Sequence, residues 1–291
     1  MRILVVGATG MLGYSIFSNL SESENLDVYG TVRNIDGLDK FFLSNDKLIS
    51  NIDVNNFKSL ERAVTTIKPD VVINCIGLIK QYDVSKRHIE SININALLPH
   101  KIAQLCDTFE ARLIHFSTDC VFDGKTGNYI ESDLPTATDL YGKSKCLGEV
   151  DYGKHVTLRT SIIGHELKSS VSLIDWFLSQ EGSTVQGFSK AIFSGLPTAY
   201  IAKVLKDYVL PNSSLSGLYQ LSVDPIDKYT LISTVADIYK KQIKIEKFEG
   251  FVIDRSLNSA KFREATGFIP PSWDELVEFM HTDYIKRYND E

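Results

Sequence analysis

The sequence is poor in cysteine, and its cysteines form no pattern that suggests chemistry. Four occur among 291 residues, and no two of them stand in a CxxC spacing. Paired cysteines of that kind would indicate a zinc site or a redox dithiol, so neither is expected and no metal ligands are predicted. Scattered cysteines at this frequency are typical of small buried residues in a reducing compartment.

The chain also lacks long apolar runs and long basic runs. Its first apolar run, residues 3–6, ends at Gly7 and is too short for a signal-peptide core. No run approaches the roughly 20 residues that span a bilayer, so we expect a cytoplasmic protein without membrane contacts. The net charge of −6 argues against nucleic acid as a partner. A phosphorylated ligand remains compatible with it, because a helix N-terminus and one or two basic side chains can hold a phosphate.

Apolar runs with the length of strands alternate with helical patterns. The expected strands cover residues 2–6, 26–32, 48–53, 71–75, 112–117, 156–160 and 243–248, and further helices are expected at 165–180 and 197–209. This alternation predicts an α/β fold, a doubly wound parallel sheet of the Rossmann type with helices on both faces. We expect residues 1–161 to bind a dinucleotide and residues 162–291 to form a smaller, mainly helical substrate lobe. Residues at about 185–222 are expected to return to the main sheet.

A glycine-rich turn joins the first expected strand to the first expected helix. It reads Gly7-Ala-Thr-Gly-Met-Leu-Gly13. In such a turn the first glycine permits the tight bend, the second lets a pyrophosphate approach the backbone, and the third lets the helix pack against the strand. Backbone N–H groups at the helix start then face the anion. We predict that a nicotinamide dinucleotide binds here, against Gly7, Thr9, Gly10, Met11, Leu12 and Gly13.

The end of the second expected strand bears on which nicotinamide cofactor fits. Enzymes that use NAD place an acidic residue there, on the ribose hydroxyls. This chain has Gly30-Thr-Val-Arg33, which contains no carboxylate that would repel a 2′-phosphate and one cation that can attract it. The sequence therefore favours NADPH, with NADH as the second option. Asp53 and Val54, after the third strand, are expected to border the adenine.

A tyrosine and a lysine four residues apart suggest reductase chemistry. Tyr141 and Lys145 would share one face of a helix that starts near Tyr141. Hydride addition to a carbonyl leaves an alkoxide that needs a proton, and a neighbouring ammonium would lower the pKa of a tyrosine that supplies it. The preceding strand ends near Thr118, whose hydroxyl can bond a substrate oxygen. A second TyrxxxLys pair, Tyr82 and Lys86, lacks this context and is interpreted as a chance match.

Together these segments resemble the extended short-chain dehydrogenase/reductases, and within them the dTDP-4-dehydrorhamnose reductase (RmlD-like) family of sugar-nucleotide reductases. The residues that carry the resemblance are Gly7–Gly13, Val72-Ile-Asn-Cys75, Ser117-Thr-Asp-Cys-Val-Phe-Asp-Gly124, Tyr129-x-Glu131, Tyr141-Gly-Lys-Ser-Lys145, Gly148-Glu149, Leu158-Arg-Thr160, Ser194-Gly-Leu-Pro-Thr198 and Asp254-Arg-Ser256. The resemblance implies that Thr118, Tyr141 and Lys145 are catalytic and that NADPH reduces C4 of a keto sugar linked to a nucleoside diphosphate. It also implies cofactor contacts for Cys75, Ile76, Gly77 and Asn95, and allows a homodimer. Asn95 matches a family asparagine whose role is either structural or in proton relay.

One position departs from the family pattern. Where the family has tyrosine after Thr-Asp, this chain has Cys120, which leaves the identity of the sugar open. Related 4,6-dehydratases carry Asp-Glu after the threonine, and elimination needs both groups. Asp119-Cys120 lacks the glutamate, so dehydration is not expected. Ser117, Asp119 and Cys120 are predicted to face the substrate.

Four further residues are candidates for the substrate site. Arg255, expected to start a helix, and Lys168 carry the charge that a diphosphate needs, although surface ion pairs would explain them equally well. Trp176 could stack on a base or pack in a core. His165 follows a glycine after the sixth strand, where it could line the site.

These features predict an NADPH-dependent reductase of a 4-keto-6-deoxy sugar nucleotide in surface-polysaccharide synthesis. Two alternatives remain open at this point. One is an epimerase that keeps NAD(P) tightly bound, and the other is a non-catalytic NADP-binding regulatory subunit.

Overall fold

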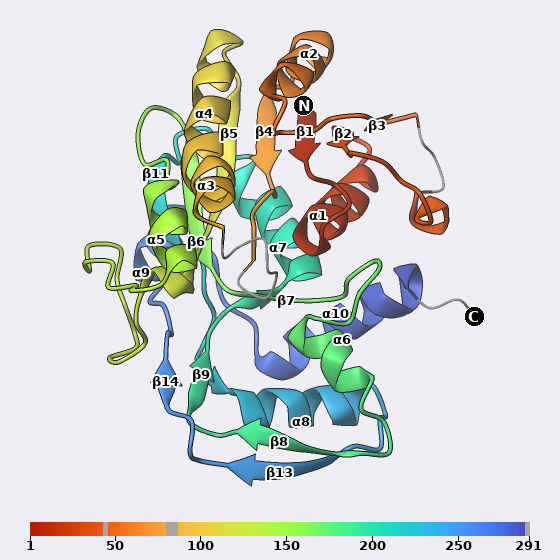
Figure 1. The fold of residues 1–291 in the computed structure, drawn as a ribbon, viewed down its shortest axis with the longest axis vertical. Coiled ribbons are helices and arrows are strands. Elements are labelled where there is room, and N and C mark those ends of the chain that lie inside the picture. Colours follow the sequence, from red (N-terminus) through yellow and green to blue (C-terminus); the bar gives the residue numbers. More distant parts are fainter. Residues whose placement is uncertain (43–45, 80–86, 289–291) are drawn as a thin grey trace.

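A seven-stranded sheet forms the centre of the protein, in a computed structural model that describes residues 1–42, 46–79 and 87–288 (Figure 1). The strand order is β11-β6-β5-β4-β1-β2-β3, and every neighbouring pair is parallel. The strands are β1 (Arg2–Val6), β2 (Asp27–Thr31), β3 (Leu48–Ile49), β4 (Val71–Asn74), β5 (Arg112–Thr118), β6 (Val156–Thr160) and β11 (Gly217–Gln220). The expected doubly wound parallel sheet is confirmed. Its order reverses between β1 and β4, where such folds leave a crevice at the carboxyl edge.

Helices cover both faces of the sheet, because a parallel sheet of apolar strands must be buried on both sides. Successive residues of β1 alternate between two cores: Ile3 lies in one and Leu4 in the other. The first core takes in α1 (Met11–Ser21) and α7 (Thr198–Val204), and the second takes in α2 (Phe57–Ile67) and α4 (Leu98–Thr108). α4 is preceded by α3 (His88–Ser91) and a π-helical turn (Ile92–Leu97), and α5 (Leu140–Leu147) packs against that turn.

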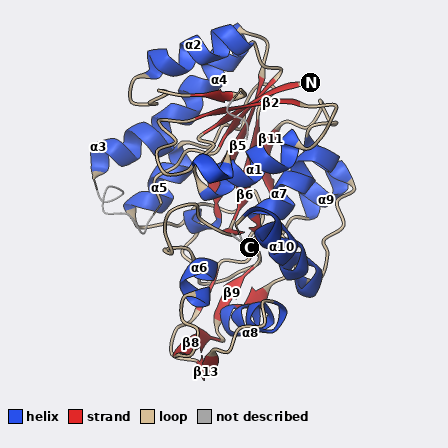
Figure 2. Cartoon of the chain, turned by 90° about the vertical axis from the view of Figure 1, so that its right-hand side faces the viewer, coloured by secondary structure: helices blue, strands red, loops and turns tan. Residues whose placement is uncertain are grey.

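The chain after β6 builds a smaller lobe below the sheet and then returns to it (Figures 1 and 2). The lobe has its own apolar core. Its elements are β7 (Ile162–Ile163), α6 (Leu173–Leu178), β8 (Thr184–Phe188), β9 (Ala191–Phe193), β10 (Leu196–Pro197), β12 (Ile226–Asp227), α8 (Lys228–Ile238), β13 (Lys244–Phe248), β14 (Ile253–Asp254) and α10 (Trp273–Arg287). Strand β11 pairs with β6 in the main sheet, and α9 (Ala260–Thr266) lies beside it.

Two expected elements are shorter in the structure than the sequence pattern suggests. The third strand ends at Ile49 because Asn51 adopts a left-handed conformation, with φ of 62°. The helix expected over 165–180 begins only at Leu173. The Glu166 carboxylate accepts hydrogen bonds from the backbone N–H groups of Val171 and Ser172, so this backbone is held in a loop. Ser172 then caps α6.

Within the described parts of the chain, none of the helices has both the length and the apolar character that crossing a bilayer requires.

Helix α1 closely approaches the end of β1 at the glycine turn. A Cβ added at Gly13 would lie 2.0 Å from the Gly7 carbonyl oxygen, whereas one added at Gly10 would meet only that oxygen, at 3.6 Å. We expect Gly13→Ala to lower the free energy of unfolding by about 2 kcal/mol or more, because α1 must move off β1. Gly10→Ala is the matched control and should unfold like the wild type. Urea unfolding monitored by circular dichroism checks this, and equal stability of the two variants would contradict it.

Candidate active site

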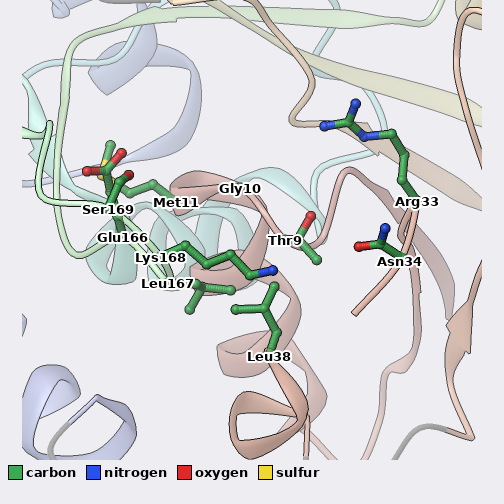
Figure 3. A pocket seen from close by; sticks show the side chains of 10 residues that line it. All are labelled: Thr9, Gly10, Met11, Arg33, Asn34, Leu38, Glu166, Leu167, Lys168 and Ser169. Atoms are coloured by element: carbon green, nitrogen blue, oxygen red, sulfur yellow. The ribbon is translucent and has the colours of Figure 1, made fainter. Parts of the chain in front are cut away.

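The turn from β1 to α1 opens onto a pocket of about 550 Å³ (Figure 3). Gly10 caps α1 without any side-chain hydrogen bond, so the first backbone N–H groups of the helix have no capping side chain. Such groups bind phosphate. Thr9, Gly10 and Met11 line this pocket, whereas Leu12 and Gly13 are buried in the helix–sheet packing. The residues therefore fit a dinucleotide pyrophosphate, with Leu12 and Gly13 shaping the turn from behind.

The opposite wall of the pocket follows β2. Arg33, Asn34 and Leu38 line it. Asp53 and Val54 follow β3 nearby but do not line the pocket, and the Asp53 carboxylate instead accepts two hydrogen bonds from Asn55. No acidic side chain from the segment after β2 lines this pocket among the described residues. The wall thus presents one cation where an adenosine ribose would lie.

The segment after β4 connects the glycine turn to the expected catalytic residues. Cys75 continues the sheet through a backbone hydrogen bond to Val6, and a Cβ added at Gly7 would lie 2.6 Å from Cγ1 of Ile76. On the other side, a Cβ added at Gly77 would lie 3.8 Å from the Lys145 ammonium nitrogen. Residues 75–77 therefore lie between the dinucleotide turn and Lys145, which is where a nicotinamide would have to reach.

Asn95 holds this connecting segment in place. Its side chain accepts a hydrogen bond from Leu78 N–H at 2.8 Å and donates to the Leu78 carbonyl at 3.2 Å and to Ser144 Oγ at 3.3 Å. It lies in the π-helical turn, an irregularity often found at functional sites. These contacts join the segment after β4 to α5.

Thr118, Tyr141 and Lys145 all lie at the carboxyl end of β5. Thr118 is the last residue of that strand, and Asp139 caps α5 so that Tyr141 lies in its first turn. The buried ammonium of Lys145 donates a 2.7 Å hydrogen bond to the Phe116 carbonyl oxygen, in the same strand as Thr118. The helical spacing of tyrosine and lysine is as predicted, and strand β5 supports both.

The protonation of this group differs from the sequence expectation. Burial raises the pKa of Tyr141, the nearby Cys120 adds to the increase, and a hydrogen bond with Thr118 opposes it. Burial also lowers the pKa of Lys145 to about 8, against the pull of Glu149. The acidification of Tyr141 by Lys145 expected from the sequence is not found here, because burial makes the largest contribution to the Tyr141 pKa and Lys145 is not among its causes. The phenol is consequently protonated at neutral pH and can act as a proton donor.

A buried ion pair supports the same edge and was not assigned a role from the sequence. Glu149 Oε1 accepts hydrogen bonds from Ser117 Oγ at 2.6 Å and from Arg159 Nε at 2.7 Å, and Oε2 accepts from Arg159 Nη2 at 2.7 Å. Ser117 therefore faces this pair. Glu149 and Arg159 both belong to motifs that resemble the family. Their pairing depends on β5 and β6 being neighbouring strands, and the spacing of the motifs in the sequence does not show this.

Asp119, Cys120 and Arg255 lie together next to Thr118. The Arg255 guanidinium donates to the Phe122 carbonyl at 2.9 Å and lies 3.8 Å from Cys120 Sγ. Burial raises the pKa of Asp119, and the charge of Arg255 opposes the shift. Arg255 does not start a helix as expected. It follows β14 in extended chain, and α9 begins only at Ala260.

The other three substrate candidates lie elsewhere. His165 is buried in the lobe, with Nδ1 2.6 Å from Asp175 Oδ1 and Nε2 2.9 Å from the Tyr239 hydroxyl, so the expectation that it lines the site was wrong. Trp176 is 40% exposed on α6 and is not among the residues that line the pocket at the glycine turn. Lys168 lines the pocket at the glycine turn. The alternative pair of Tyr82 and Lys86 lies outside the described residues.

Comparisons with known proteins agree with this architecture. Residues 1–221 match the family described as RmlD substrate binding domain. The chain is 28% identical over 257 residues to methionine adenosyltransferase 2 subunit beta of Danio rerio, covering 82% of this chain and 74% of that protein. It is 26% identical over 311 residues to dTDP-4-dehydrorhamnose reductase of Salmonella typhimurium, covering 97% and 98%. A crystal structure of dTDP-4-dehydrorhamnose reductase from Bacillus anthracis in complex with NADP has the same fold, with a TM-score of 0.79 at 22% identity and coverage of 97% and 99%.

The fold, the glycine turn and the family match define an NAD(P)H-dependent oxidoreductase of the extended short-chain dehydrogenase/reductase class. Within that class, the chain belongs to the RmlD substrate-binding family. The resemblance inferred from the sequence motifs is confirmed.

The buried position of Lys145 leads to a direct titration test. Its pKa of about 8 means that the ammonium form dominates below pH 8 and the neutral amine above it. In protein with ¹³C-labelled lysine, we expect one Cε resonance to titrate with a midpoint near pH 8. That resonance should be missing from Lys145→Met. A Lys145 resonance that has not moved by pH 9.5 would contradict the lowered pKa.

Proposed function

We propose that the protein reduces the 4-keto group of a nucleoside-diphosphate 6-deoxy sugar with NADPH, in the cytoplasm, as a step of surface-polysaccharide synthesis. The observation that carries the proposal is the short path from the dinucleotide turn to the proton donor. Ile76 packs against Gly7, and Gly77 lies beside Lys145 and Asn95. A bound nicotinamide and a substrate carbonyl can therefore meet beside Tyr141.

In the proposed reaction, NADPH supplies a hydride when it is bound. The Tyr141 phenol donates its proton to the substrate oxygen as charge develops there. Thr118, already bonded to the phenol, orients the same oxygen. The hydrogen bond with Thr118 favours the phenolate that remains, and Lys145, beside Gly77, is placed to hold the ribose of the bound nicotinamide.

NADPH is the proposed cofactor because of the wall after β2. Arg33 lines the pocket, and the segment that precedes it, from Gly30, carries no carboxylate that would repel a 2′-phosphate. The solved relative from Bacillus anthracis was in complex with NADP. NADH stays the second option.

The 4-keto sugar nucleotide is proposed from the relatives and from the Thr118 turn. The Salmonella relative is a dTDP-4-dehydrorhamnose reductase. Beside Tyr141, this chain places the guanidinium of Arg255 and the small side chain of Cys120. Arg255 can bind the sugar or its diphosphate. Cys120, where the family pattern has tyrosine, leaves more room beside the sugar and supplies no carboxylate for elimination.

A second candidate is a regulatory subunit that binds the dinucleotide without catalysis. The similarity to methionine adenosyltransferase 2 subunit beta favours it. A binding role, however, needs neither a protonated phenol nor a buried ammonium beside the glycine turn. The geometry of Tyr141 and Lys145 is explained by catalysis and not by binding alone.

The proposal is tested with purified protein, NADPH or NADH, and a panel of enzymatically generated 4-keto-6-deoxy sugar nucleotides. We expect NADPH oxidation with at least one member and a higher kcat/KM for NADPH than for NADH. Tyr141→Phe should lower kcat about 100-fold or more, because general acid catalysis contributes on that scale.

Tyr152→Phe provides the matched control, since that hydroxyl contacts His100 instead of the Thr118 cluster. It should keep wild-type turnover. Near-normal turnover of Tyr141→Phe would refute the proposed proton donor. If NADPH binds but no panel member is reduced, the regulatory candidate is favoured.

A further inference from the structure

The pocket at the glycine turn has a third wall, which comes from the lobe. Glu166, Leu167, Lys168 and Ser169 line it from the loop between β7 and α6. Figure 3 shows the Lys168 side chain extended along the pocket, with its ammonium directed toward Thr9 and Leu38. The lobe thus adds a charged side chain to a site otherwise formed by the dinucleotide-binding half.

This loop is shaped by contacts that do not involve Lys168. The Glu166 carboxylate accepts from the N–H groups of Val171 and Ser172 at 2.8 and 2.9 Å. Glu166 N–H donates to the Asp175 carboxylate at 2.6 Å, and His165 bonds the same carboxylate. Removing the Lys168 ammonium therefore leaves the loop's own hydrogen bonds intact.

The Lys168 ammonium reaches across to the segment that follows β2. It donates a hydrogen bond to the backbone carbonyl of Asp36, three residues beyond Arg33. Within the described ranges, neither Lys168 nor Arg33 has a carboxylate within salt-bridge distance. A neutral carbonyl does not cancel the ammonium charge, so Lys168 and Arg33 bring two positive charges from different parts of the chain to the same pocket. Glu166 lines it as well, with its carboxylate held by the N–H groups of Val171 and Ser172.

We propose that Lys168 binds the 2′-phosphate of the NADPH adenosine ribose from the lobe side, opposite Arg33. The inference rests on the proposed cofactor and adds a second specificity-determining residue to it. The ribose lies on the Arg33 side because the pyrophosphate takes the helix N-terminus at Gly10. Lys168 is anchored to that same side through Asp36, and a dianionic phosphate between two cations replaces its hydration with charge-assisted hydrogen bonds.

The proposal is tested by isothermal titration of the full-length protein with NADPH, NADH and adenosine 2′,5′-bisphosphate, without any sugar. Lys168→Met should weaken binding of the two 2′-phosphorylated ligands about fivefold to tenfold and leave NADH within twofold of the wild type. Lys168→Arg should recover most of the loss. Lys206→Met removes an exposed lysine outside the pocket and should bind all ligands normally.

Equal weakening of NADPH and NADH by Lys168→Met would overturn the proposal, since it would place the ammonium on the pyrophosphate or reveal a collapsed loop. An unchanged affinity for NADPH would overturn it as well, and so would a wild type that binds both cofactors equally. Failure of the proposed reaction is distinguishable. Protein that shows the expected binding pattern but reduces no sugar nucleotide refutes the reaction and leaves the role of Lys168 standing.

Discussion

The parallel register of β1, β4 and β5 is the constraint on which the site depends. Val6 pairs with Asn74, and Asn74 pairs with His115, so β1 and β4 end at the same level while β5 continues three residues further along the same edge to Thr118. The glycine turn, residues 75–77 and the Thr118 turn therefore leave the sheet side by side. Each segment alone would have little chemical meaning. The common edge brings the helix start at Gly10, residues 75–77 and the Tyr141 phenol to one crevice.

Burial gives this edge its electrostatic character. Burial disfavours the charged form of Lys145 and so lowers its pKa. The Phe116 carbonyl oxygen accepts a hydrogen bond from its ammonium. The Glu149–Arg159 ion pair accepts a hydrogen bond from Ser117, which lies in β5 next to Phe116. Removing one partner of a buried ion pair lowers the free energy of unfolding by about 3–5 kcal/mol. This pair therefore holds the ends of β5 and β6 in position as well as balancing its own charges. The same burial keeps Tyr141 protonated, which suits a group that gives up a proton.

The sequence allowed prediction of the features that short motifs encode. Strand–helix alternation, the Gly7–Gly13 turn and the helical spacing of Tyr141 and Lys145 are local, and each appears where it was expected. Features that depend on packing could not be read in the same way. The loop at 166–172 looked helical because its carboxylate-to-backbone hydrogen bonds are invisible to periodicity. The pKa of Tyr141 depends on burial, which spacing does not reveal, and Lys168 reaches the cofactor pocket only through tertiary structure.

The central claim is that hydride from the bound nicotinamide and a proton from Tyr141 arrive at one carbonyl. The most direct measurement uses NADPH carrying deuterium at both positions of nicotinamide C4, with a 4-keto-6-deoxy sugar nucleotide as acceptor and mass spectrometry and NMR of the product. The account predicts one deuterium on the sugar, at the carbon that was the ketone. A product without deuterium, or with the label at any other carbon, would contradict it.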